Sequence, residues 1–159
     1  MTALILIEPA KPEDAHELAV LVGELLGEIM QATGLAAFNF DLAGTTARLK
    51  DWLEEGKYFV LAARDARGSN IGFAALAESH ALYAEGAFGT LTELYVKPSF
   101  RSQGTGSRLL AAADELARAR GWKRLEVTTP PLPQFDKTLA FYQREGFTIA
   151  GGRKLKRAL

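Results

Sequence analysis

The feature that most constrains the fold is a strand, a glycine-containing loop, a helix and a second strand that follow one another from residue 90 to residue 129. TLTELYVK (90–97) reads as a strand, and apolar residues then recur at helical spacing from Leu109 to Ala117, before Gly121 ends the helix. LEVTT (125–129) follows as the next strand. A helix that returns the chain between two neighbouring strands makes them parallel. We therefore expect a parallel pair within the sheet.

The rest of the chain favours antiparallel hairpins and further helices. In order, the pattern predicts a strand at 4–8, a helix from Pro12 to about Ile29, a helix at 42–53, a hairpin of strands at 57–65 and 71–79, a loop at 80–89, a helix at 135–145 and a closing hairpin at 147–156. Hairpins together with one crossover predict an α/β (α+β) fold: one domain over residues 1–159, with a mixed sheet of about seven strands and about four flanking helices.

Composition narrows the class of protein. A chain of 159 residues that is 48% hydrophobic suits one domain with a core of its own. Lys plus Arg and Asp plus Glu both number 19, so no basic excess favours nucleic acid as a partner. Cysteine is absent, which excludes disulfides and thiolate chemistry, and we expect no metal site. The apolar run at 4–7 is too short for a signal peptide or a membrane span, which favours a cytoplasmic protein without membrane contact.

Gly104 and Gly106 stand where the helix begins. Backbone N–H groups at a helix start have no intrahelical partner, and the helix dipole adds positive potential there. Glycine lets the backbone approach a bulky diphosphate, so the loop predicts an anion site. A tight turn with close helix packing explains the two glycines equally well. A dinucleotide or Walker loop is disfavoured, since Leu109 occupies the third glycine position and no GK[ST] follows.

Two motifs at this separation resemble those of the GCN5-related N-acetyltransferases (GNAT). In VKPSFRSQGTGSRLL, Arg101, Gly104 and Gly106 occupy the family's Arg/Gln-x-x-Gly-x-Gly places, and FYQREGF (141–147) is similar to its Phe-Tyr-x-x-x-Gly-Phe segment. The resemblance covers nearly the whole chain. It implies a GNAT-like fold in which the fourth and fifth strands splay apart, and acetyl-CoA as cosubstrate with its pantetheine arm in the gap.

The resemblance also implies which residues hold acetyl-CoA. Backbone groups of the fourth strand would pair with the arm, and backbone amides of the glycine loop would hold the pyrophosphate. The family often has an Asn where this chain has Phe135, so Phe135 would pack on the arm or a neighbouring residue would supply the polar contact. The predicted cofactor residues are Leu94, Tyr95, Val96, Arg101, Ser102, Gln103, Gly104, Thr105, Gly106, Ser107 and Phe135.

Two residues are candidates for proton transfer. Glu93 lies in an otherwise apolar strand beside the expected thioester, where burial would raise its pKa toward that of a useful base. A salt-bridged or rim carboxylate is the alternative. Tyr142 stands where the family usually has the acid that protonates the departing thiolate, and a core aromatic with a satisfied hydroxyl is the alternative.

The resemblance places the acceptor opposite the cofactor, where Phe38, Phe40, Tyr83 and Glu85 are the candidates, with ordinary loop packing as the alternative.

The predicted function is acetyl-CoA-dependent acetylation of a primary amine of a small molecule. A noncatalytic acyl-CoA sensor and acetylation of a peptide or protein N-terminus are the alternatives. Relatives often pair into a homodimer, but the basic terminus RKLKRAL is equally consistent with a solvated tail.

Overall fold

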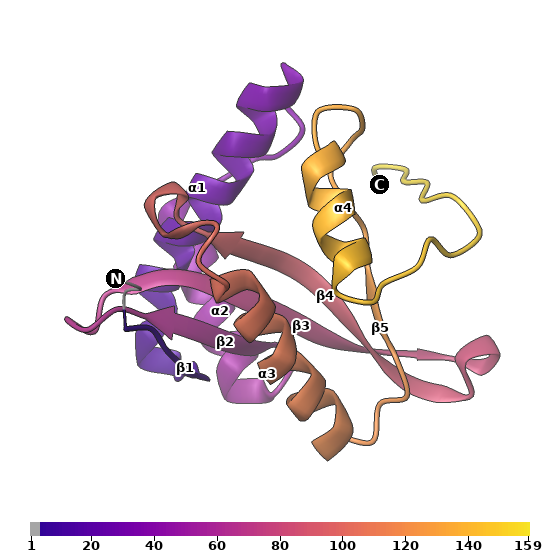
Figure 1. The fold of residues 1–159 in the computed structure, drawn as a ribbon, viewed down its shortest axis with the longest axis horizontal. Coiled ribbons are helices and arrows are strands. Elements are labelled where there is room, and N and C mark those ends of the chain that lie inside the picture. Colours follow the sequence, from indigo (N-terminus) through magenta and orange to yellow (C-terminus); the bar gives the residue numbers. More distant parts are fainter. Residues whose placement is uncertain (1–3) are drawn as a thin grey trace. The chain divides into compact units, whose positions relative to one another are not determined.

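The computed structural model describes residues 4–159, and contacts divide the chain into two compact units, one up to Thr128 and one from Thr129 to Leu159. The first unit contains a five-stranded sheet in the order β1-β2-β3-β4-β5 (Figure 1). Neighbouring strands are antiparallel except for β4 and β5, which are parallel, so the predicted mixed sheet is confirmed. The strands are β1 (Leu6–Pro9), β2 (Phe59–Arg64), β3 (Asn70–Ala81), β4 (Gly86–Val96) and β5 (Leu125–Val127).

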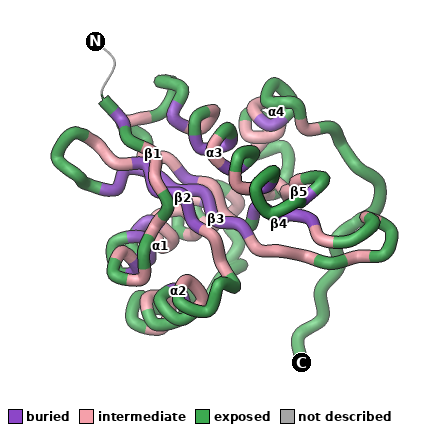
Figure 2. Tube along the Cα trace, turned by 90° about the horizontal axis from the view of Figure 1, so that it is seen from below, coloured by how far each residue is buried: buried purple, intermediate pink, exposed green. Residues whose placement is uncertain are grey.

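Helices cover both faces of this sheet. α1 (Ala15–Thr33) and α2 (Leu42–Glu55) lie on one face and α3 (Thr105–Ala119) on the other, with the buried middle strands between them (Figure 2). Short 3-10 turns occupy Pro12–Asp14, Leu82–Ala84 and Pro98–Phe100. On the α1 and α2 face, alternate strand residues form one apolar core with both helices: Ala15, Leu18, Leu21, Leu49, Val60, Ala62, Phe73, Ala75 and Tyr95.

β4 has two irregularities that matter for the site. Ala75 pairs with Glu93 while Leu76 pairs with Leu91, so Thr92 is an extra residue and forms a β-bulge. On its other side, β4 pairs with β5 only through Gly89–Leu91. Beyond the bulge β5 no longer accompanies β4, which is the splay expected from the resemblance.

The hairpin of β3 and β4 is longer than the sequence predicts. The sequence predicts a loop at residues 80–89, but His80 and Ala81 pair with Ala87 and Gly86, and only the short turn at 82–85 reverses the chain. The prediction is wrong because strand pairing continues through a segment that lacks a clear alternation of apolar and polar residues.

The second unit contains α4 (Asp136–Arg144), near the predicted 135–145, but no strand among its residues 129–159. The closing hairpin at 147–156 is therefore wrong, and the sheet has five strands instead of about seven. Ile149 and Leu155 are 74% and 91% exposed, so a strand there would bury no apolar face. Across the described residues, 4–159, none of the helices is both long and apolar enough to cross a membrane.

Candidate active site

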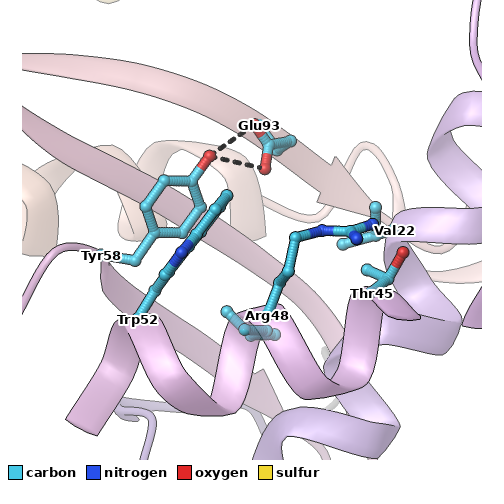
Figure 3. Close-up of a pocket in the computed structure, with 7 residues that line it drawn as sticks. Val22, Thr45, Arg48, Trp52, Tyr58 and Glu93 are labelled. Atoms are coloured by element: carbon cyan, nitrogen blue, oxygen red, sulfur yellow. Dashed lines mark hydrogen bonds between the residues drawn. The ribbon is translucent and has the colours of Figure 1, made fainter. Parts of the chain in front are cut away.

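A small open cavity of about 60 Å³ lies between α1, α2 and the sheet (Figure 3). Glu93 reaches it from β4, and the rings of Trp52 and Tyr58 stand side by side within it, 4.9 Å apart between centroids. Because all of its lining residues belong to the first unit, the cavity is complete within that unit. The lining residues are Val22, Thr45, Arg48, Leu49, Trp52, Tyr58 and Glu93.

Glu93 carries the only carboxylate in this lining. The Tyr58 hydroxyl donates to both of its oxygens at 3.3 Å. Burial raises the pKa of Glu93 above its ordinary value, and the hydrogen bond from Tyr58 opposes that rise. Burial also raises the pKa of Tyr58 to about 12, with the charge of Glu93 adding to the effect. Tyr58 is therefore a neutral donor, and Glu93 is a carboxylate with increased proton affinity.

The edge of β4 beyond the bulge has backbone groups that pair with neither β3 nor β5. The Lys97 amide donates to the Ile71 carbonyl at 2.8 Å, and antiparallel pairs alternate between bonded and non-bonded. The backbone groups of Tyr95 therefore face β3, while those of Leu94 and Val96 face the side that β5 has left. The Val96 carbonyl agrees with this, since it accepts from Nε of Arg101 at 2.7 Å. Among the three strand residues predicted to bind the cofactor, Leu94 and Val96 have N–H and C=O groups that face away from β3.

The glycine loop ends at the start of α3. Gly104 is the N-cap residue with φ +82°, a left-handed conformation that favours glycine, and no side chain caps this helix end. Gly106 lies within the first turn of α3, and Thr105 is buried. The amides of this turn have no intrahelical partner. Ser102 and Gln103 are exposed beside them, and Ser102 also has a positive φ of 61°.

Arg101 is engaged within the protein. Its two terminal nitrogens donate to the two carboxylate oxygens of Glu28, each at 2.8 Å, so the pair is bidentate. Its guanidinium also lies 5.5 Å from the centre of the Tyr95 ring, whose hydroxyl donates to Glu24 at 3.0 Å. These contacts tie the loop after β4 to α1.

Tyr142 and Phe135 belong to the second unit. Phe135 is the N-cap residue of α4, and Tyr142 lies on that helix. The Tyr142 ring is buried, with its centroid 5.4 Å from those of Phe141 and Phe147. Burial raises the pKa of Tyr142 to about 12, so its hydroxyl keeps its proton near neutral pH.

The four predicted acceptor residues do not line the cavity. Phe38 and Phe40 lie between α1 and α2, and the Phe40 ring packs so closely on Gly23 that a Cβ there would lie 2.7 Å from it. Tyr83 and Glu85 lie at the turn between β3 and β4, at the far end of β4 from Glu93. At about 3.3 Å per residue, that turn is roughly 25 Å along β4 from Glu93.

Four residues that line the cavity were not predicted from the sequence as site residues: Thr45, Arg48, Trp52 and Tyr58. One signal was present: Thr45, Arg48, Leu49 and Trp52 follow the i, i+3, i+4, i+7 spacing of one helix face, and Leu49 is buried in the core. Polar residues on a core-facing stripe indicate that the stripe borders a cavity as well as the core.

The comparisons with known proteins agree with this architecture. Residues 54–149 match the family described as "Acetyltransferase (GNAT) domain". The chain is also 31% identical, over 141 residues, to "Uncharacterized N-acetyltransferase YhfO" of Bacillus subtilis (strain 168), covering 89% of this chain and 88% of that protein. The chain therefore belongs to the GNAT family of N-acetyltransferases, and it is an enzyme of the acyltransferase class.

Solved structures share the fold at low sequence identity. The aminoglycoside N-acetyltransferase AAC(6')-Iy in complex with CoA has a TM-score of 0.80 at 19% identity, with 99% of this chain and 97% of that chain covered. The ribosomal-protein-alanine N-acetyltransferase from Brucella melitensis biovar Abortus 2308 has a TM-score of 0.73 at 20% identity, with 98% and 99% covered. At identities this low, the similarity establishes the shared fold and gives no information on the acceptor of this protein.

Proposed function

We propose that the protein transfers the acetyl group of acetyl-CoA directly to a primary amine of a small molecule. One observation carries the proposal: Glu93, the carboxylate of the cavity, directly follows the bulge at Thr92, where β4 separates from β5. The candidate base, Glu93, is thus next in sequence to the strand edge at residues 94–96 that β5 does not cover. The small volume of the cavity suits one amine-bearing arm of an acceptor.

The first unit has two features that fit acetyl-CoA. The outward backbone groups of Leu94 and the outward amide of Val96 suit the amide-rich pantetheine arm, which would pair with β4 as an added strand does, while the Val96 carbonyl accepts from Arg101. The uncapped start of α3, with the amides of Thr105 and Gly106, suits the pyrophosphate. Ser102, Gln103, Gly104 and Ser107 would flank that group. Arg101 would hold the loop in place through Glu28, and Phe135 would border the arm.

In the proposed reaction, acetyl-CoA supplies the acetyl group as a thioester. Glu93 accepts a proton from the acceptor ammonium, directly or through water, and the freed nitrogen forms the new bond to the acetyl carbon. The carbon–sulfur bond breaks, and Tyr142 donates its proton to the departing thiolate. The nitrogen loses its second proton as the amide forms, and that proton returns Tyr142 to its neutral form. The raised pKa of Glu93 suits its role, since Glu93 holds a proton more readily, and the raised pKa of Tyr142 means that its hydroxyl still carries the proton near neutral pH.

Release of free thiol from acetyl-CoA across a panel of small amines and N-terminal peptides tests the proposal. We expect turnover with at least one small amine, and loss of turnover in Tyr142→Phe with unchanged acetyl-CoA affinity. Binding of acetyl-CoA without thiol release from any amine would contradict the proposal and favour a noncatalytic sensor. Turnover with peptides alone would favour a peptide or protein N-terminus as acceptor.

A further inference from the structure

The cavity beside Glu93 contains a second polar end. Arg48 is the only cationic residue in its lining, and Thr45 lies three residues earlier on the same face of α2. Figure 3 shows the Arg48 side chain extending toward Thr45 and Val22, while the rings of Trp52 and Tyr58 lie on the other side of it. The lining therefore has a carboxylate on β4 and two hydrogen-bond donors on α2.

Neither of these donors is occupied within the protein. Across the described residues, 4–159, the Arg48 guanidinium makes no ion pair and the Thr45 hydroxyl makes no side-chain hydrogen bond. Asp41, at the start of the same helix, accepts from the Gly44 amide at 2.6 Å and serves as the helix cap. Arg48 is also not ion-paired with Glu93, although both line one cavity. An exposed arginine and a hydroxyl side by side form a ready receptor for an anionic oxygen group.

The lining between the two polar ends is apolar and aromatic. Val22, Leu49 and Trp52 contribute carbon surface, so the cavity offers an anion receptor, a short apolar stretch and a proton acceptor. An acceptor that satisfies all three has an amine, a short carbon chain and an anionic group. We propose that the acceptor amine also carries a carboxylate, which binds Arg48 and Thr45 while the amine faces Glu93. This inference rests on the proposed function.

Charge separates this class of acceptor from polycationic amines. Several solved structures with this fold are aminoglycoside acetyltransferases. A polycation here would bring positive charge against Arg48, with Glu93 as the single carboxylate of the lining to offset it. The Arg48 guanidinium thus disfavours such acceptors and favours one with an anionic group.

The experiment compares matched sets of amines that differ in the group at the end opposite the amine, with kanamycin added as a polycationic acceptor. Initial rates are measured for ω-amino acids from glycine to 6-aminohexanoate, their primary amides, the matching alkylamines, phosphoethanolamine and kanamycin, with wild type and Arg48→Gln. We expect the amino acids to have the lowest KM. We expect Arg48→Gln to raise that KM by roughly 10- to 100-fold, the effect of losing a charge-assisted hydrogen-bonded pair, and to leave the amides unchanged.

Lys50→Gln is the matched control, because Lys50 lies exposed on the same helix and outside the cavity lining. It should leave every KM unchanged, and both variants should keep the wild-type KM for acetyl-CoA. A lower KM for phosphoethanolamine or kanamycin than for the amino acids would overturn the carboxylate inference alone. A lower KM for the amides, unchanged in Arg48→Gln, would overturn it as well. Thiol release from no amine at all would overturn the proposed function and this inference together.

Discussion

The two halves of the candidate site differ in how the sequence encodes them. The half proposed for acetyl-CoA is one continuous stretch, residues 94–107, which contains the edge of β4, the glycine loop and the start of α3. The cavity proposed for the acceptor is assembled from α1, α2, the residue before β2, and β4, and its lining runs from Val22 to Glu93. Backbone groups dominate the first half and side chains the second. The half proposed for the cosubstrate therefore corresponds to a local sequence motif, whereas the half proposed for the acceptor corresponds only to residues at helical spacing on α2.

The largest effect is expected where the two halves meet, at Glu93. Glu93→Gln keeps the shape and the hydrogen bond from Tyr58 but cannot accept a proton, so kcat should fall by about 10²- to 10⁴-fold. Acetyl-CoA affinity, measured by calorimetry, should remain that of wild type, because no backbone group of the β4 edge changes. If Glu93→Gln lost acetyl-CoA affinity as well as turnover, Glu93 would contribute to both halves of the site.

Gly104→Val should affect the cofactor half alone. A β-branched residue at φ +82° strains the loop by about 1–2 kcal/mol and turns the amides at the start of α3 away from the pyrophosphate. We expect the Kd for acetyl-CoA to rise by roughly 10- to 100-fold, as one or two charge-assisted hydrogen bonds are lost. The amine KM should change little.

Gly68→Val is a close control for this variant. Gly68 has φ +80° in the turn between β2 and β3, and at both positions an added Cβ meets nothing within 4 Å. The two variants should therefore lose similar stability in thermal unfolding. Equal acetyl-CoA affinity in both variants would mean that Gly104 serves only the turn.

Trp52→Ala should affect the acceptor half alone. It removes one wall of the cavity and the ring that packs against Tyr58 at 4.9 Å, an interaction worth about 1 kcal/mol. We expect the amine KM to rise about tenfold and the acetyl-CoA KM to stay constant. An unchanged amine KM in steady-state kinetics would place the acceptor outside this cavity.

The smallest effect is expected at Arg101, which ties the cofactor half to α1. Its pair with Glu28 is bidentate but partly exposed, so Arg101→Met should lower stability by about 1 kcal/mol or less in denaturant unfolding. If Arg101 only positions the loop, Glu28→Gln should weaken acetyl-CoA binding as much as Arg101→Met does. A larger loss of affinity in Arg101→Met would indicate direct contact with the cosubstrate.

The sequence predicts the fold wherever local signals agree with packing. The helix at 42–53 ends by Gly56 as expected, and the strand-helix-strand unit gives the parallel pair of β4 and β5. The sequence fails at residues 80–89, because pairing of two long strands is a tertiary effect that local composition does not reveal. It fails again at 147–156, where glycines suggest a hairpin but Ile149 stays exposed.

For the site, β4 was predictable and α2 was not. The lone acidic residue in TLTELYV predicts a special role for Glu93; the structure places Glu93 in the cavity lining, and its role as a base stays a prediction. Aromatic residues in a loop predict a pocket at Phe38 and Phe40; both lie outside the lining of this cavity, the Phe40 ring packs on Gly23, and their role at an acceptor stays a prediction. The sequence alone does not distinguish Arg48, because an exposed arginine on an amphipathic helix is common.

The most direct test of the central claim, that Glu93 is the base within this cavity, is the pH dependence of kcat/KM. Glu93 must be ionised to accept a proton, and burial raises its pKa, so activity should fall as the pH drops through a value above the ordinary range of glutamate. Tyr58→Phe removes a hydrogen bond that lowers this pKa, so the acidic limb should move to still higher pH. Tyr83→Phe, outside the cavity lining, should leave the limb in place. An acidic limb of the kcat/KM profile that does not shift in Tyr58→Phe and is still present in Glu93→Gln would contradict the claim.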